Sequence, residues 1–467
     1  MNSDHSWKKI AAVAALGAVA LTGIARHAFA QAAAAQPETH YKDQGEYDAY
    51  NAVTMDIVGK NFAKAITDLD TWKQKYPDSW YKDIRQTLYI QAYNETKQFP
   101  KVLDTAAELM AKGDLDTVFS DPKRGAQDEV TVLFMATLAV QQTPTPSPEQ
   151  LATGEKAARK LLEFNRKPQG VADADWNNAK NQLQAAAKAA LLTIAVLPGN
   201  QAMAKNPRDC DTAASVYTKA LGDYPDKSFI SYSLGTALNC IARAHPDKAK
   251  EIAPKAIYEF VRAAVTDPSL GGSGDPKKIT DYANSAYTAY HGSDEGLDAL
   301  KAQAKTAPLP PANFAIETSA DVANRKQQEF AQSNPQLAMW MGIKAQLADP
   351  ANGTTYFEST LKNAAVPKLK GTVVEGKPAC RSKEILVAVP LPDQQGAPTA
   401  EITLKLDAPL TGKPETGEIQ WEGVPSEFTQ TPAFMLTMDT EKAKIEGLKT
   451  TPCAAAPARR GPATKKK

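Results

Sequence analysis

The segments 213-AASVYTKALGDYP-225 and 256-AIYEFVRAAVTDP-268 follow one spacing rule. In each, an alanine is followed four positions later by an aromatic residue, three later by another alanine, and five later by a proline. Spacings of four and three place the first three side chains on one face of a helix. The proline marks where that helix ends. We therefore expect two helices, each packed closely against a neighbouring helix through small residues beside an aromatic ring.

The same spacing returns in other parts of the chain. Four further segments repeat it in full or in part: Ala65, Leu69, Trp72 and Pro77; Val102, Ala106 and Leu109, with Asp114 in place of proline; Ala157, Leu161 and Phe164, with Pro168 one residue early; and Gly296, Leu300, Gln303 and Pro308. Other helix-forming segments, 80–96, 228–242 and 277–290, precede such units. A recurring helix pair predicts an α-solenoid. We expect five to seven pairs within residues 46–345, and a generic helical bundle is the alternative.

This pattern resembles the tetratricopeptide repeat (TPR), a helix pair of about 34 residues with the same spacing. The resemblance covers about two-thirds of the chain. The prolines at 225, 268 and 308 are 43 and 40 residues apart, so the loops are longer than in a regular TPR array. The resemblance implies a non-catalytic scaffold with a concave surface, lined by the first helix of each pair, where peptides or partner helices bind.

Carried onto this chain, the resemblance assigns nine polar or aromatic residues at helical spacing to that concave face. They are Thr87, Gln91 and Asn94; Tyr232, Thr236 and Asn239; and Asp281, Ser285 and Thr288. An ordinary solvated helix face is the alternative interpretation. Tyr282, Tyr287 and Tyr290 are expected to pack against neighbouring helices.

The pattern changes at about residue 366, after an expected helical junction at 346–365. Short runs with β-branched and aromatic residues follow, and Glu401–Leu406 alternates strictly between polar and apolar residues, as a half-buried strand does. We expect a small all-β domain, a barrel or a sandwich, at 366–449. The order of its strands resembles an oligonucleotide/oligosaccharide-binding (OB) barrel. The strand Glu418–Glu422 is acidic, which disfavours nucleic acid and favours an accessory or protein-docking role.

The N-terminal residues predict export. Met1–Lys9 is polar and ends in two lysines, Ile10–Ala25 is apolar, and Ala28–Ala30 matches a cleavage site. This pattern is typical of a signal peptide at 1–30, cleaved after Ala30, and it is too short for a membrane anchor. We expect a linker at 31–45, a periplasmic or extracellular location, and a disordered basic tail at 450–467. Without residues 1–30, 51 basic and 52 acidic residues remain, and this balance disfavours nucleic-acid and membrane partners.

Motifs of catalysis and cofactor binding are missing from the sequence. The three histidines beyond residue 30, His40, His245 and His291, are far apart and have no metal-ligand spacing. Neither a nucleophile elbow nor a phosphate-binding glycine fingerprint occurs, and the GGSG run at 271–274 lacks the residues that would complete one. The sequence thus predicts no catalytic residue, no metal and no cofactor.

The four cysteines are the most specific chemical feature. Cys210 and Cys240 lie fifteen residues before and after Pro225, so two antiparallel helices meeting at that turn would place them side by side. We expect a disulfide between them, and a second one between Cys380 and Cys453. The alternative for the second pair is two free thiols.

These observations together favour an exported scaffold that binds protein or peptide partners in the cell envelope. A carbohydrate- or cell-wall-binding protein is the second hypothesis. An enzyme with an unfamiliar site is the third.

Overall fold

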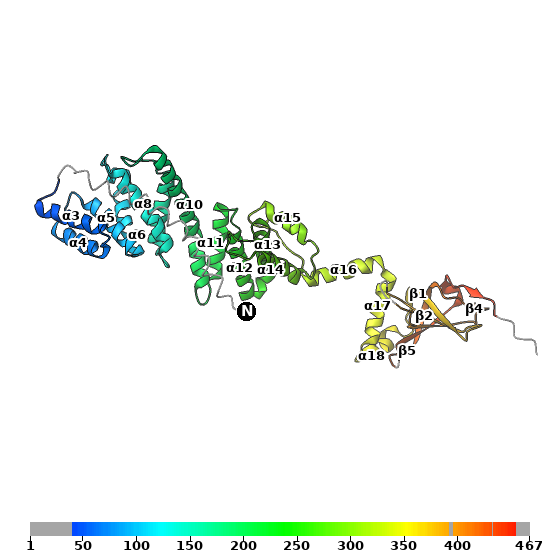
Figure 1. Ribbon diagram of the computed structural model, residues 1–467. Helices are drawn as coiled ribbons and strands as arrows, with labels where there is room; N and C mark the ends of the chain where they lie inside the picture. The colour runs from blue at the N-terminus through cyan, green and yellow to red at the C-terminus, as the bar shows by residue number, and fades with distance from the viewer. Residues whose placement is uncertain (1–39, 392–395, 432, 454–467) are drawn as a thin grey trace, which may run out of the picture. The chain divides into compact units, whose positions relative to one another are not determined.

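The computed structural model describes residues 40–391, 396–431 and 433–453, which form two compact units divided between Ser319 and Ala320 (Figure 1). We call them the helical unit and the barrel unit. The predicted signal peptide, most of the 31–45 linker and the tail from residue 454 onward lie outside the described residues. Within the described ranges, no helix is both long enough and apolar enough to cross a membrane.

The helical unit is a solenoid of helix pairs, in which each helix packs against the next along the chain as far as α14, and α15 packs against α13 (Figure 1). Its helices are α3 (Gln44–Val58), α4 (Phe62–Lys75), α5 (Lys82–Glu95), α6 (Phe99–Ala111), the short α7 (Leu115–Val118), α8 (Gly125–Gln142), α9 (Pro148–Glu163), α10 (Asp173–Ala204), α11 (Cys210–Asp223), α12 (Ser228–Ala244), α13 (Ala249–Thr266), α14 (Pro276–His291) and α15 (Leu297–Thr306). A 3-10 turn, η2 (Pro246–Lys248), precedes α13. The predicted solenoid is confirmed, with six pairs among the described residues if α7 is left out.

The motif prolines end helices as expected. α4, α11, α13 and α15 each end two residues before the proline of their motif. The ring of a proline clashes with a helical conformation of the residue before it, so the chain leaves the helix there. The motif side chains on α4, α6, α11 and α13 are buried between helices. Gln303 on α15, the imperfect position, is exposed instead.

Close packing of α12 on α13 requires a glycine at position 235. A Cβ atom there would lie 2.9 Å from the Phe260 ring and 3.1 Å from the Ala256 carbonyl oxygen. Gly235→Ala should therefore lower the free energy of unfolding by about 1–3 kcal/mol, measured by urea denaturation followed by circular dichroism. Gly222→Ala on α11 is the matched control because a Cβ there meets nothing within 4 Å, and it should keep or raise stability. Equal effects of the two changes would contradict the packing argument.

The barrel unit combines three helices with a closed β-barrel. The helices are α16 (Ser319–Ser333), α17 (Pro335–Ala348) and α18 (Gly353–Tyr356), which continues as a π-turn, η3 (Phe357–Leu361). The barrel strands are β1 (Val366–Lys377), β2 (Glu384–Ala388), β3 (Ile402–Leu406), β5 (Glu418–Thr429) and β6 (Met435–Thr440). They close in the order β1-β2-β3-β6-β5-β1, and only the β3–β6 pairing is parallel. The predicted small β domain is confirmed as a barrel.

Shorter elements complete the barrel unit. A 3-10 turn, η4 (Lys442–Lys444), leads into β7 (Ile445–Glu446), which pairs with β5, while β4 (Lys413–Pro414) pairs with β8 (Thr450–Thr451). In β3, Ile402, Leu404 and Leu406 are buried in the core and Lys405 is exposed, as the alternation predicts, but Thr403 is buried as well.

The boundary between the units differs from the expected one. Trp340 and Leu347 of α17 are buried in the core of the barrel. The Trp340 indole N–H also donates to a carboxylate oxygen of Glu401, at 3.2 Å. α17 therefore belongs with the barrel and not with the repeat domain predicted to reach residue 345. Helical periodicity shows that a face is buried but not which core it enters.

Both predicted disulfides are present. Cys210 at the start of α11 is bonded to Cys240 on α12, with 6.1 Å between the Cα atoms. Cys380, in the β1–β2 connection, is bonded to Cys453 just after β8, with a Cα separation of 6.0 Å. The first bond therefore joins two neighbouring helix pairs, and the second fastens the last described residue to the barrel.

Candidate functional site

The predicted concave face is not accessible along its whole length. On α5, Thr87 and Gln91 are buried and only Asn94 is half-buried. The reason is that α5 packs against α4, α6 and α8. Thr87 and Gln91 therefore serve helix packing, and assigning them to a binding face was wrong for this conformation.

The remaining six predicted residues lie on α12 and α14 and keep some exposure. Tyr232, Thr236, Asn239 and Thr288 are half-buried, and Asp281 and Ser285 are exposed. The Tyr232 ring lies 6.3 Å from the Tyr282 ring, measured between centroids, so the two helices present neighbouring surfaces. We call these six residues with Tyr282 the α12–α14 face. Its role in binding stays a prediction.

Several polar groups of this face are already engaged locally. Thr236 donates its hydroxyl to the Tyr232 carbonyl at 2.8 Å, and Thr288 donates to the Ser285 carbonyl at 3.3 Å. Asp281 pairs with Lys277 at 2.5 Å on the solvent side. The face therefore offers mainly tyrosine rings, an asparagine amide and the Ser285 hydroxyl to a partner.

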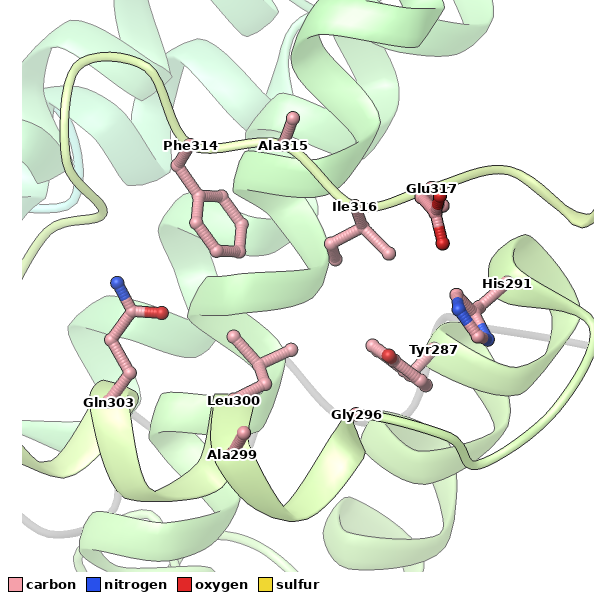
Figure 2. A pocket seen from close by; sticks show the side chains of 10 residues that line it. All are labelled: Tyr287, His291, Gly296, Ala299, Leu300, Gln303, Phe314, Ala315, Ile316 and Glu317. Carbon is pink, nitrogen blue, oxygen red and sulfur yellow. The ribbon is translucent and has the colours of Figure 1, made fainter. Parts of the chain in front are cut away.

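A hollow of about 250 Å³ opens on the other side of α14, between α14, α15 and the segment that follows α15 (Figure 2). α13 packs against both α14 and α15. The hollow is lined by Tyr287 and His291 of α14, by Gly296, Ala299, Leu300 and Gln303, and by residues 314–317. Sequence reasoning did not find it, because it had placed Tyr287 in packing and His291 among isolated histidines.

Ring stacking and hydrogen bonds fix the α14 wall of the hollow. Tyr287 and His291 are one helical turn apart, and their rings stack at 5.2 Å. The Tyr287 hydroxyl donates to the Glu295 carbonyl at 2.5 Å, and His291 Nδ1 lies 3.2 Å from the Ser293 hydroxyl. Burial raises the pKa of Tyr287, and the carboxylates of Glu295 and Glu317 raise it further. Tyr287 is therefore a neutral hydrogen-bond donor at physiological pH.

The wall also requires a glycine at position 296. Gly296 has φ +85°, a conformation that side-chain-bearing residues rarely adopt, and its Cβ would lie 2.8 Å from the Tyr287 hydroxyl. The backbone at the start of α15 can approach the tyrosine only because this side chain is missing.

Two α13 side chains hold the segment after α15. The Tyr258 hydroxyl and the Arg262 Nε both donate to the Ala307 carbonyl, each at 3.0 Å. Further along the segment, the Phe314 ring packs edge-on against Tyr258 at 5.2 Å. The opposite wall of the hollow is thus anchored to the solenoid core.

A buried acid lies in the same region of α13. Glu259 is 0% exposed, and neither carboxylate oxygen has a hydrogen-bond partner among the described residues. Burial raises its pKa to about 8, while Ser231 and Arg262 nearby oppose that rise. Arg262 is satisfied elsewhere, because it donates to Ser231 at 2.6 Å and to the Pro225 and Ala307 carbonyls.

Comparison with known proteins gives no family for this arrangement. No protein-family model matches the chain, and no curated protein matches it. Among the described residues, no group of three or more histidine, cysteine, aspartate or glutamate side chains is placed to hold a metal ion. The functional argument therefore depends on the geometry of the surfaces.

The barrel unit has a hollow of its own, of about 460 Å³, beside the ends of β3 and β6, the middle of β5 and the start of β1. Its charged lining residues carry both signs: Lys405, Lys444, Asp407, Glu422, Asp439 and Glu441. Acidic residues outnumber lysines in this lining by four to two, and Lys444 is paired with Glu441 at 3.4 Å.

Proposed function

We propose that the protein is an exported, non-catalytic scaffold of the TPR type that binds a protein or peptide partner in the cell envelope. The observation that carries the proposal is the solenoid of helix pairs whose first helices leave the α12–α14 face partly open. Surfaces built from stacked helix pairs bind extended partners in repeat proteins. The two disulfides suit an oxidising compartment and support export.

The closed barrel of five strands supports the resemblance to an OB barrel, whose members bind ligands with one face and its loops. We propose that it is an accessory docking domain, which leaves partner selection to the helical unit.

Site-specific photo-crosslinking in cells tests the scaffold proposal. A benzophenone amino acid in place of Ser285, which is exposed on α14, should crosslink a discrete partner protein. The same group in place of Ser215, which is exposed on the second helix α11, is the matched control and should not. Equal crosslinking at both positions, or none at either, would contradict binding through the first helices.

One observation near the start of the helical unit favours the carbohydrate hypothesis. Trp80 is 58% exposed, its ring lies 4.6 Å from His40, and Tyr41 stacks on Tyr81 behind it at 4.5 Å. An exposed indole held by other rings offers a rigid apolar surface for the face of a sugar. Retention of the chain on a glycan resin, and its loss in Trp80→Ala, would support this second function; retention of both would exclude Trp80.

A further inference from the structure

The helix at the end of the solenoid carries an exposed apolar face. α3 lies at one end of the helical unit and packs chiefly against α4, through the side that includes the buried Val53 (Figure 1). On its other side, Tyr47, Met55 and Val58 are 39%, 70% and 60% exposed. Their spacing places these three side chains on one face of the helix. Three of the eight exposed large apolar side chains in the described chain therefore lie on this one helix.

Such a face is unusual at the end of a solenoid. A terminal helix has a neighbour on one side only, and its outer face is commonly polar because it meets water. Contiguous exposed apolar side chains mark a surface that another molecule covers.

The charges on α3 that have no ion pair are of opposite sign at its two ends. Asp48, in the second turn, accepts a hydrogen bond from the Gln44 amide at 2.8 Å, and Lys60 directly follows the C-cap residue. Both are exposed, and neither makes an ion pair within the described ranges. The other nearby charges offset one another, Lys42 beside Asp43 and Lys64 between Asp56 and Asp68.

This order of charges is complementary to itself. In a two-fold contact between antiparallel α3 helices, every contact is made twice, because residue i meets j and j meets i. With the axis near residue 53, Tyr47 of one copy lies near Val58 of the other, and Met55 lies near Asn51. Lys60 then comes within the reach of its side chain to Asp48 of the second copy. A parallel arrangement would bring like charges together instead.

We propose that the protein self-associates through the Tyr47, Met55 and Val58 face of α3, as a two-fold dimer oriented by Asp48–Lys60 pairs between copies. The contact is small, because a helix of 15 residues is only about 22 Å long. One helix face covers less than the roughly 800 Å² that each partner buries in a standard interface. We therefore expect a dissociation constant of about 10–100 μM. The inference goes beyond the proposed function and uses no residue of the α12–α14 face, so either can fail without the other.

Sedimentation velocity of the chain from residue 31 onward, at concentrations from about 5 to 300 μM, measures this equilibrium. Met55→Ser with Val58→Ser should weaken the association by about tenfold or more, because it removes the apolar area that the contact buries. Both side chains are exposed, so the fold should tolerate the change. Met341→Ser is the matched control, because it removes an exposed methionine of the barrel unit, and it should leave the association unchanged.

Charge reversal tests the orientation. Asp48→Lys or Lys60→Asp alone places like charges opposite each other in both halves of the dimer, and each should weaken the association about five- to thirtyfold. An equimolar mixture of the two variants should recover it, because each lysine of one copy then meets an aspartate of the other. Position 60 has φ 59°, in the left-handed region that aspartate tolerates.

Three results would overturn the inference. They are a chain that stays monomeric over this range, an association that is unchanged in Met55→Ser with Val58→Ser, and a mixture of the charge-reversed variants that associates no better than either alone. A benzophenone amino acid in place of Asn51 separates the possible occupants in cells. Crosslinking between two copies of the chain is the expected result, whereas crosslinking to a different protein alone would assign the face to that protein.

Discussion

Replacing Cys210 and Cys240 together by serine is expected to lower the free energy of unfolding of the helical unit by about 3–4 kcal/mol. The bond closes a loop of 30 residues. Without it, the conformational entropy of the unfolded chain is higher, so the folded state is less stable. The effect should be large because the bond joins α11 to α12, at the boundary between two helix pairs. Loss of helical ellipticity on heating should occur roughly 5–15 °C lower.

The matched control is the second disulfide. Cys380→Ser with Cys453→Ser removes a bond within the barrel unit. It should therefore leave the temperature at which the helical unit loses its ellipticity unchanged. Reduction of the unchanged protein by dithiothreitol should lower that transition as far as the first double substitution does. A helical transition that is indifferent to both treatments would show that this bond adds nothing to the solenoid.

Glu259→Gln is expected to raise stability at pH 8 and to remove a pH dependence. The folded protein holds the Glu259 proton up to a pKa of about 8, while the unfolded chain releases it near 4.5. The stabilisation is therefore complete below pH 4.5, declines as the pH rises, and is lost above about 8. At about 1.4 kcal/mol per pKa unit, the loss across this range is about 3–5 kcal/mol.

Urea denaturation at several pH values between 4.5 and 8.5 measures this slope. The groups facing Glu259 are Ser231 on α12 and Arg262 on α13, and a glutamine preserves the shape of the side chain beside them. Glu251→Gln, on the same helix but exposed, should keep the slope of the unchanged protein. Parallel pH profiles for Glu259→Gln and the unchanged protein would mean that Glu259 is not the group responsible.

The sequence predicted best what depends on local spacing. The motif around Tyr217 predicted a buried helix face and the end of α11 before Pro225, and equal distances from that proline predicted the Cys210–Cys240 bond. Alternation in β3 likewise predicted that Ile402, Leu404 and Leu406 enter the barrel core, although it did not predict the burial of Thr403.

Features that depend on long-range packing were not predictable. The spacing of Thr87 and Gln91 marks a helix face, but their burial depends on neighbouring helices. Trp340 lies in a helical pattern that does not reveal its partner core. Residues 314–317 have no helical period, so nothing local indicated that they form one wall of a hollow.

Arg262 determines how the last part of the solenoid can come apart. Its guanidinium joins the turn before α12, the α12 hydroxyl of Ser231 and the chain just after α15. If α15 separated from α13, Arg262 would lose the Ala307 carbonyl as an acceptor while its guanidinium stayed buried between α12 and α13. A buried cation that lacks a hydrogen-bond acceptor lowers the stability of that state. Terminal repeats of a solenoid commonly fray, because they have a neighbour on one side only. Here Arg262, together with Tyr258 on the same Ala307 carbonyl, fixes the chain just after α15, which leads to the 314–317 wall of the hollow.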